Sequence, residues 1–159
     1  MSSVHRTQFS DMSPAVQKTA GLVAGTRVMT ADGELPVEYL SPGDRIATRA
    51  GTRILQAVAT RVDLDVQMVR IKASSLGFDR PSEETLLPLH QLILIRDWRA
   101  QALYGAPQAL VAAGRLADGD YMSIETVAIA RVFTLQFADD VVIYADGLEI
   151  ACMRETVTA

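Results

Sequence analysis

The chain carries few side chains that could act as nucleophiles, acids or bases. Its single cysteine is Cys152, and its two histidines are His5 and His90. A serine, a histidine and a carboxylate together can hydrolyse esters or amides, and Ser123, His90 and Asp120 supply these three residue types. No Gly-x-Ser-x-Gly turn surrounds Ser123, which argues against a hydrolase of that design. His5 is expected to be solvated.

The remaining polar residues give no sign of a metal or cofactor site. Glu83-Glu84 and Asp139-Asp140 fall in polar stretches and are typical of loop carboxylates that face water. Two histidines far apart in sequence and one cysteine do not form a familiar set of metal ligands, and a lone cysteine excludes an internal disulfide. We therefore expect no bound metal and no cofactor.

The strongest structural signals lie between residues 21 and 51, the stretch that must organise the rest of the fold. A run that includes Val28 leads into Asp32-Gly33, a dipeptide that predicts a tight hairpin between apolar runs. Pro36 suits the first turn of a short helix, because its missing N–H would be unbonded there in any case. Ser41-Pro42-Gly43-Asp44 then predicts a turn, since proline presets its second position and glycine takes a positive φ in its third.

Most of the remaining chain has the pattern of strands. Five are expected, at residues 54–60, 62–68, 86–95, 133–137 and 141–144, with a loop at 73–84, a short strand at 107–111 and one helical turn at 112–116. Alternation slips by one residue after residue 68, which predicts a bulge or a bend, and before the slip it places Asp63 and Asp65 on a solvated face. The apolar run 86–95 is typical of a strand buried on both faces, so that His90 is either a core histidine or the remnant of a catalytic site.

The chain also contains a short internal repeat. Leu-Ser-Pro-Gly-Asp-Arg-Ile at residues 40–46 reappears as Leu-Ala-Asp-Gly-Asp-Tyr-Met at residues 116–122. Each copy follows a short segment that carries Ala or Val and precedes an apolar strand. The repetition predicts two similar halves.

These motifs resemble the opening of a Hint domain, the self-processing fold of hedgehog autoprocessing domains and inteins, and lie nearest to its short bacterial members. The matching elements are Ala24-Gly25-Thr26, the strand at residues 27–30, Asp32-Gly33, Pro36-Val37-Glu38, Leu40 and Pro42-Gly43-Asp44. The resemblance covers residues 21–153, with residues 1–20 as a leader segment and 154–159 as a tail. It implies a mostly β, pseudo-two-fold domain of two similar halves with one or two short helical turns.

The resemblance also implies three site positions. Hint self-processing begins when a thiol or hydroxyl attacks the carbonyl just before its own residue. The position of that nucleophile, four residues before the glycine of Ala-Gly-Thr, is Gly21. The Thr-x-x-His or Ser-x-x-His element of the family falls on Leu87 and His90, so the histidine is kept and the hydroxyl is missing. The terminal His-Asn pair of inteins has no counterpart at residues 148–153.

We therefore expect a Hint-like domain in which Gly21, Leu87 and His90 are vestigial site positions and no catalytic residue is intact. Such a domain would serve as a structural or protein-interaction module. The alternative is residual self-cleavage near residue 20, with a nearby threonine or Cys152 replacing the lost nucleophile. The candidate threonines are Thr19 and Thr26. The simplest interpretation of Thr26 is a strand-entry residue that bonds backbone, and that of Cys152 is a small buried hydrophobe.

Composition limits the partners and the location. About half of the 159 residues are hydrophobic and the net charge is −4, which describes an ordinary globule without a basic surface for nucleic acid. Residues 1–18 lack the apolar core of a secretory signal, and the run 86–95 is too short to cross a bilayer. We expect a cytoplasmic protein, with export by a leaderless route left open. Its partner would be another protein or its own N-terminal segment, and its oligomeric state is left open.

Overall fold

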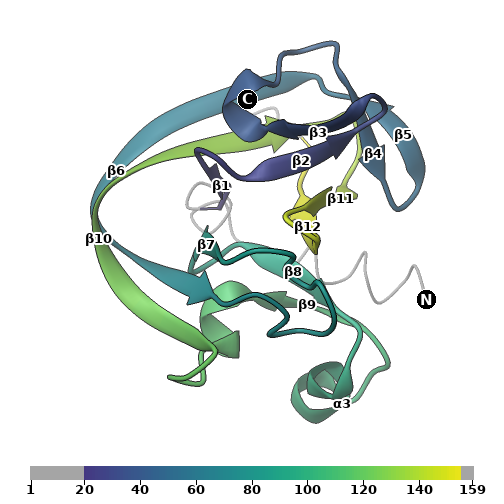
Figure 1. Cartoon of the computed structure of the whole chain (residues 1–159). Coiled ribbons are helices and arrows are strands. Elements are labelled where there is room, and N and C mark those ends of the chain that lie inside the picture. Colours follow the sequence, from purple (N-terminus) through teal and green to yellow (C-terminus); the bar gives the residue numbers. More distant parts are fainter. Residues whose placement is uncertain (1–19, 155–159) are drawn as a thin grey trace, which may run out of the picture.

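The computed structural model describes residues 20–154, which form two antiparallel sheets with one α-helix and two 3-10 turns (Figure 1). The four-stranded sheet has the order β1-β10-β6-β7, with β1 at Leu22–Val23, β6 at Ala57–Ile71, β7 at Thr85–Pro88 and β10 at Met122–Gln136. The eight-stranded sheet has the order β3-β2-β4-β11-β12-β8-β9, and β5 pairs with β4 off that path. Its strands are β2 Arg27–Thr30, β3 Gly33–Pro36, β4 Arg45–Thr48, β5 Gly51–Ile54, β8 Leu92–Ile95, β9 Ala109–Ala112, β11 Val141–Ala145 and β12 Leu148–Cys152. The mostly β fold expected from the sequence is confirmed.

A long curved ribbon of β6 and β10 forms one side of the molecule (Figure 1). The two strands, 15 residues each, stay in a single register from Met122↔Ile71 to Gln136↔Ala57. No residue is inserted at the slip after residue 68, and the irregular backbone lies three residues earlier, at Asp65 with φ 47°. Asp65 is exposed, as predicted, whereas Asp63 is only partly exposed, with 25% of its side chain accessible. The expected apolar face was wrong here, because Val62 and Leu64 are 57% and 67% exposed.

The opening unit follows the sequence prediction closely. β2 and β3 form the hairpin around Asp32-Gly33, in which Met29 faces Glu34. The short helix is a single 3-10 turn, η1 at Val37–Tyr39, with Pro36 as its N-cap. The next turn has Gly43 at φ 97°, as the sequence required.

The two copies of the internal repeat have equivalent local structures. A second 3-10 turn, η2 at Ala113–Leu116, precedes the second copy just as η1 precedes the first. Leu40 and Leu116 are both buried, and so are Ile46 and Met122 at the other end of each copy. The shared glycine has a positive φ in each, so the copies turn in the same way.

The predicted single strand at residues 86–95 was wrong. The chain turns at residues 89–90, so that β7 joins the four-stranded sheet and β8 joins the eight-stranded sheet. His90 lies in this turn and is exposed, not in the core. After β8 comes the one α-helix of the described residues, α3 at Trp98–Tyr104, which begins where the Asp97 side chain accepts a hydrogen bond from the Arg99 N–H at 2.9 Å.

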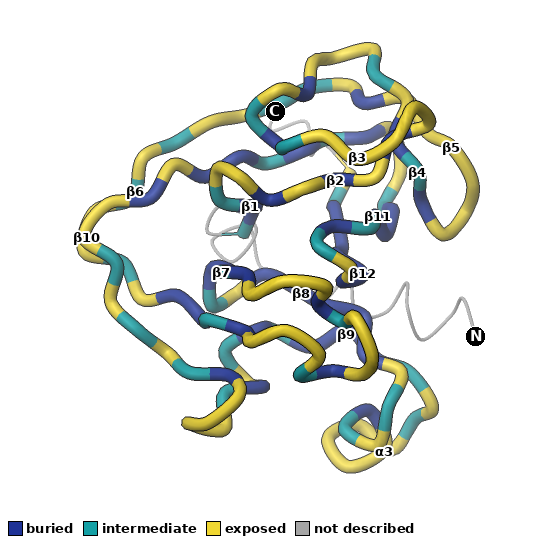
Figure 2. Tube along the Cα trace, viewed as in Figure 1, coloured by how far each residue is buried: buried dark blue, intermediate teal, exposed yellow. Residues whose placement is uncertain are grey.

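The main hydrophobic core lies between the two sheets. Leu22, Ile71 and Phe133 contribute from the four-stranded sheet, and Ile93 and Ile143 from the eight-stranded sheet. In Figure 2 the trace is largely buried where the two sheets face each other and largely exposed along the outer bend of the β6–β10 ribbon. No helix among residues 20–154 has the length and apolar character needed to span a bilayer.

Candidate functional site

The Ala20–Gly21 peptide bond lies against the four-stranded sheet just before β1, which pairs with β10 through Leu22↔Phe133. The carbonyl oxygen of Ala20 accepts two hydrogen bonds, from Arg61 Nη1 at 2.8 Å and from Thr134 Oγ1 at 3.3 Å. These donors belong to β6 and β10, which hold them side by side because the two strands are paired. The ribbon thus presents a cation and a hydroxyl to one carbonyl.

Arg61 is held in place by Asp63 on the same strand. Its Nε donates to both carboxylate oxygens of Asp63, at 3.1 and 3.0 Å. Its Nη2 atom is buried and has no hydrogen-bond partner. A fixed guanidinium beside a carbonyl stabilises negative charge on that oxygen, which is one requirement of acyl-transfer chemistry.

Gln91 binds the other side of the same peptide bond. The Gly21 N–H donates to Gln91 Oε1 at 2.9 Å, and Gln91 is 3% exposed. Gln91 Nε2 donates to the carbonyls of Leu92 at 3.0 Å and Ala151 at 2.8 Å. Two backbone acceptors around the nitrogen and one donor at the oxygen fix the orientation of this amide. Gln91 is therefore an acceptor toward Gly21 and has no proton to give to its nitrogen.

Gly21 itself leaves no room for a side chain. Its φ is 142°, a conformation that L side chains rarely adopt. A Cβ atom at this position would lie 2.6 Å from Val132 Cγ1 and 2.8 Å from the carbonyl oxygen of Phe133. The backbone packs directly onto β10 here, and no reactive atom faces the Ala20 carbonyl from position 21.

The structure separates the other two positions that the sequence singled out. Leu87 is buried in β7, opposite Val69 of β6. His90 is exposed in the following turn, and its ring makes no hydrogen bond or ion pair within residues 20–154. The side chain that reaches the Gly21 nitrogen belongs to its neighbour Gln91. Sequence reasoning missed Gln91, although a polar residue inside an apolar run was a visible signal; Arg61 and Thr134 gave none.

The substitute nucleophiles are buried or lie outside the described residues. Thr19 falls in the undescribed part of the chain. Thr26 is 3% exposed, and its hydroxyl has no hydrogen-bond partner, so no base is bonded to it. Burial raises the pKa of the Cys152 thiol in β12 to about 12, so it is protonated near neutral pH. Neither group is an activated nucleophile.

The hydrolase triad suggested by residue types does not assemble. Ser123 lies on β10 opposite Arg70, Asp120 is exposed in the turn before that strand, and no hydrogen bond joins either to His90. The paired loop carboxylates serve local structure: Glu84 forms an ion pair with Arg70 at 3.1 Å. Within residues 20–154 no three His, Cys, Asp or Glu side chains gather as metal ligands would.

Comparison with solved structures shows what this fold is similar to. A bacterial intein-like domain from Clostridium thermocellum has a TM-score of 0.62 and 14% sequence identity, with 84% of this chain and 98% of that one covered. The gp41-1 intein has a TM-score of 0.57 and 15% identity, with 82% and 97% covered. A DnaB intein from Synechocystis sp. PCC 6803 has a TM-score of 0.55 and 12% identity, with 84% and 98% covered.

At these identities the structures show a shared fold and carry no activity across. A comparison with curated protein sequences finds no match. The family model of the Hint domain matches residues 20–156, which is most of the chain and includes both sheets. The chain therefore belongs to the Hint domain family.

Proposed function

We propose that this Hint domain does not process itself and keeps the Ala20–Gly21 bond intact as part of a structural or protein-interaction module. The observation that carries the proposal is the packing of Gly21, where a Cβ atom would overlap Val132 and the Phe133 carbonyl. A domain built closely around glycine at this position has no place for a nucleophilic side chain.

The hydrogen bonds around the peptide bond support the same proposal. Cleavage requires a sulfur or oxygen to bond to the Ala20 carbonyl carbon, the C–N bond to break, and a proton to reach the Gly21 nitrogen. The carbonyl is polarised by Arg61 and Thr134. The nitrogen instead gives its own hydrogen to Gln91, an arrangement that favours the intact amide. The residues around the bond thus stabilise the carbonyl oxygen but supply neither a nucleophile at position 21 nor a proton donor to the nitrogen.

Residual self-cleavage is the second candidate, and the polarised Ala20 carbonyl is the observation that favours it. Intact-mass spectrometry of the full chain, incubated for days with and without a thiol or hydroxylamine, separates the two. We expect the full-length mass throughout. A break between Ala20 and Gly21 in the folded protein, absent in denaturant, would overturn the proposal. If such a break occurred, Arg61→Met should slow it, because the variant loses the cation at the carbonyl.

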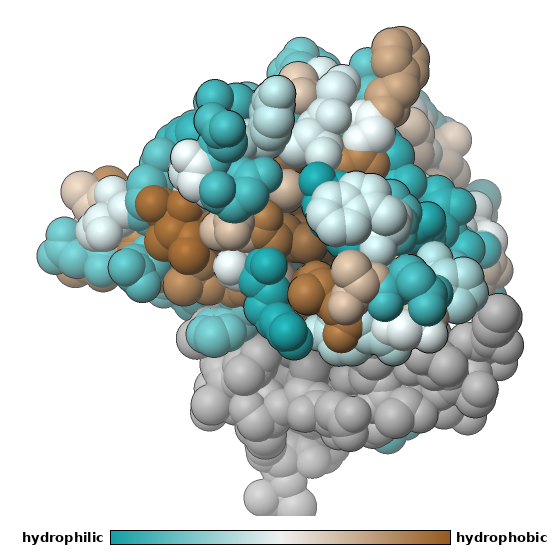
Figure 3. Space-filling model, turned by 90° about the horizontal axis from the view of Figure 1, so that it is seen from below, coloured by the Kyte–Doolittle hydropathy of each residue, from teal (hydrophilic) through white to brown (hydrophobic). Residues whose placement is uncertain are grey.

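An exposed apolar surface supports the interaction role. Leu64 and Ile129 face each other across the bend of the ribbon and are 67% and 63% exposed. Apolar side chains gather toward this protruding end in the face shown in Figure 3. Grouped apolar side chains on a surface commonly mark a site of protein contact.

The partner is another protein or residues 1–19 of the same chain, which join the described part at Ala20 beside this ribbon. Hydrogen–deuterium exchange on the full chain tests the second choice. If residues 1–19 cover the bend, Phe9→Ser together with Val16→Ser should speed exchange there. Unchanged exchange would exclude residues 1–19 as the partner of this surface.

A further inference from the structure

A second polar cluster lies on the eight-stranded sheet, away from the Ala20–Gly21 bond. Its centre is Glu149 of β12, whose side chain is 6% exposed. Glu149 Oε1 accepts from Arg49 Nη1 at 3.1 Å and from Arg96 Nη2 at 2.8 Å. Arg80 Nη2 lies 3.7 Å from Oε2, which has no hydrogen-bond partner. Three guanidinium groups thus surround one carboxylate.

The topology of the sheet brings these arginines together from different parts of the chain. Arg49 follows β4 and Arg96 follows β8, so they approach β12 from its two sides in the order β4-β11-β12-β8. Arg80 comes from the loop at residues 72–84, which is fastened to the β11–β12 turn by a hydrogen bond from Ser82 N–H to the Asp146 carbonyl at 3.0 Å. We call Arg49, Arg80 and Arg96 the three-arginine cluster.

The cluster carries more positive charge than Glu149 can balance. Three guanidinium groups against one carboxylate leave a surplus of two positive charges. Of the neighbouring acids, Asp97 is engaged by Arg99, and both oxygens of Asp146 accept from Arg27 N–H and Thr85 Oγ1. No other acidic side chain within residues 20–154 pairs with these arginines.

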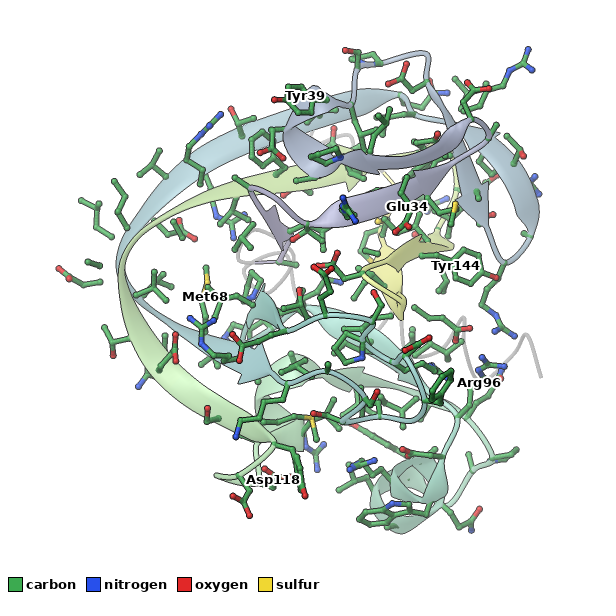
Figure 4. All side chains as sticks on the ribbon, viewed as in Figure 1. Glu34, Tyr39, Met68, Arg96, Asp118 and Tyr144 are labelled. Carbon is green, nitrogen blue, oxygen red and sulfur yellow. The ribbon has the colours of Figure 1, made fainter. Side chains whose placement is uncertain are left out.

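Most of the guanidinium donors are free to bind a ligand. Each guanidinium has five N–H donors, yet the side chains of Arg49 and Arg96 make one hydrogen bond each within residues 20–154, and that of Arg80 makes none. The three side chains are 35%, 43% and 26% exposed respectively, so solvent reaches them. Tyr144, opposite Glu149 in the β11–β12 pair, lies on the same side of the molecule as Arg96 in Figure 4.

We propose that the three-arginine cluster is a binding site for a phosphate-type dianion. Neutralising Glu149 needs only one arginine, which can bind a carboxylate with two parallel N–H bonds. The surplus of two charges matches a phosphomonoester, whose charge near neutral pH is about −1.5 to −2, better than it matches a single carboxylate. Glu149 orients the guanidinium groups, and their outward N–H donors bind the phosphate oxygens. The site does not depend on the fate of the Ala20–Gly21 bond.

A titration followed by two-dimensional amide NMR tests this site on the full chain. Inorganic phosphate is added at constant ionic strength, with chloride as the balancing anion. We expect the amide signals of Arg49, Arg96 and Glu149 to shift and to reach saturation as phosphate is raised to roughly 50 mM, which corresponds to a millimolar dissociation constant. Shifts that stay linear over that range would overturn the proposal.

Variants and a second probe sharpen the result. Arg96→Gln should weaken binding about ten-fold, because one charge-assisted contact is lost, whereas Arg131→Gln on the exposed face of β10 should leave it unchanged. Equal weakening by both variants would show attraction to net charge alone and would overturn the site. If Arg96→Gln does not fold, Arg80→Gln takes its place, because the Arg80 side chain makes no hydrogen bond within residues 20–154. Phosphate binding unchanged by that substitution would contradict the proposal.

The same titration with a short phosphoserine peptide distinguishes the two sources of the group. Tighter binding of the peptide than of inorganic phosphate would indicate a phosphorylated partner protein. Equal or weaker binding would indicate a small phosphate ester. The peptide and inorganic phosphate are compared only if phosphate first gives saturable shifts at the arginine amides; without those shifts the proposal is overturned.

Discussion

The Ala20–Gly21 junction and the three-arginine cluster treat buried polar groups in opposite ways. At the junction, the carbonyl has two donors and the N–H has one acceptor, so each polar atom of the peptide bond is held by the surrounding strands. Around Glu149, one carboxylate faces three guanidinium groups and one of its oxygens has no hydrogen bond. The first region is closed around a bond of the chain itself, whereas the second keeps donors that a ligand could use.

The two regions therefore differ in role: the junction is where the family's self-processing chemistry would occur, and the three-arginine cluster is the proposed binding site of this chain. At the junction, position 21 has no space for a side chain and both polar atoms of the amide are hydrogen-bonded, which supports the proposal that this bond stays intact. A partly exposed surplus of arginine is arranged for recognising an anion. Substitutions in either region test whether this contrast holds.

The largest effect is expected at Gly21. Gly21→Ala should lower the free energy of unfolding by about 4 kcal/mol, because it combines backbone strain at φ 142° with overlap against Val132 and Phe133. Gly25→Ala is the matched control, since Gly25 has φ 93° but nothing within 4 Å of its Cβ position, and it should cost only about 1 kcal/mol of strain. Urea unfolding of both variants measures the difference. Equal losses would show that the close packing at Gly21 does not matter.

Restoring the family's nucleophile tests the same packing through chemistry. Gly21→Cys meets the same overlap, so we expect a destabilised protein that still keeps its full-length mass in the presence of thiol. Efficient cleavage by this variant would mean that the site needs only a sulfur atom. The junction would then be a working site that lacks one residue.

Gln91 comes next. Gln91→Met keeps the volume but leaves the Gly21 N–H and the carbonyls of Leu92 and Ala151 without their partner. Three unsatisfied buried groups should cost about 3 kcal/mol after some relaxation. Gln56→Met, at an exposed position, should change stability by less than about 0.5 kcal/mol. A similar small loss for both would mean that water replaces the Gln91 amide.

The opening unit and the site differ in how far the sequence alone reveals them. The hairpin at Asp32-Gly33 and the turn at Gly43 depend on local backbone preferences, and both were predicted correctly. Gly21 was found because it stands at a fixed distance from a motif. Arg61 could not be found in this way, because it meets the Ala20 carbonyl only after β6 pairs with β10 and β1.

The same limit explains the error at residues 86–95. A mostly apolar run has no periodic signal that tells one long strand from two strands in different sheets. The turn at residues 89–90 depends on the second half of the molecule, where the Leu89 carbonyl accepts from Gly114 N–H at 2.9 Å and the Gln91 carbonyl from Ala113 N–H at 2.9 Å. The local signs of a break were the polar pair His90-Gln91 and Pro88, which can still occupy the end of a strand.

The three-arginine cluster can be weakened from its centre. Glu149→Gln removes the carboxylate around which the three arginines gather, and should lower the free energy of unfolding by about 2 kcal/mol. The loss is smaller than for a fully buried ion pair because the arginines are partly exposed. Added phosphate should restore part of this loss, whereas chloride at equal ionic strength should not. Glu125→Gln, at an exposed ion pair with Arg70, should change stability little and show no phosphate rescue. Rescue of both variants to the same extent would reflect a general salt effect.

The smallest effect concerns Cys152, which lies in the same strand as Glu149 and is buried without a charge near it. With a pKa of about 12, only about one thiol in ten thousand is ionised near pH 8, so the folded protein should resist thiol reagents that label it rapidly in denaturant. The folded pKa lies above the ordinary 9.0, so its contribution to stability is complete below that value and is lost as the pH rises toward 12. Between about pH 8 and about pH 10, the stability of the native chain relative to Cys152→Ala should therefore fall by about 1 kcal/mol. Rapid labelling of the folded chain would instead show a reachable thiolate, and would reopen Cys152 as a replacement nucleophile for the Ala20 carbonyl.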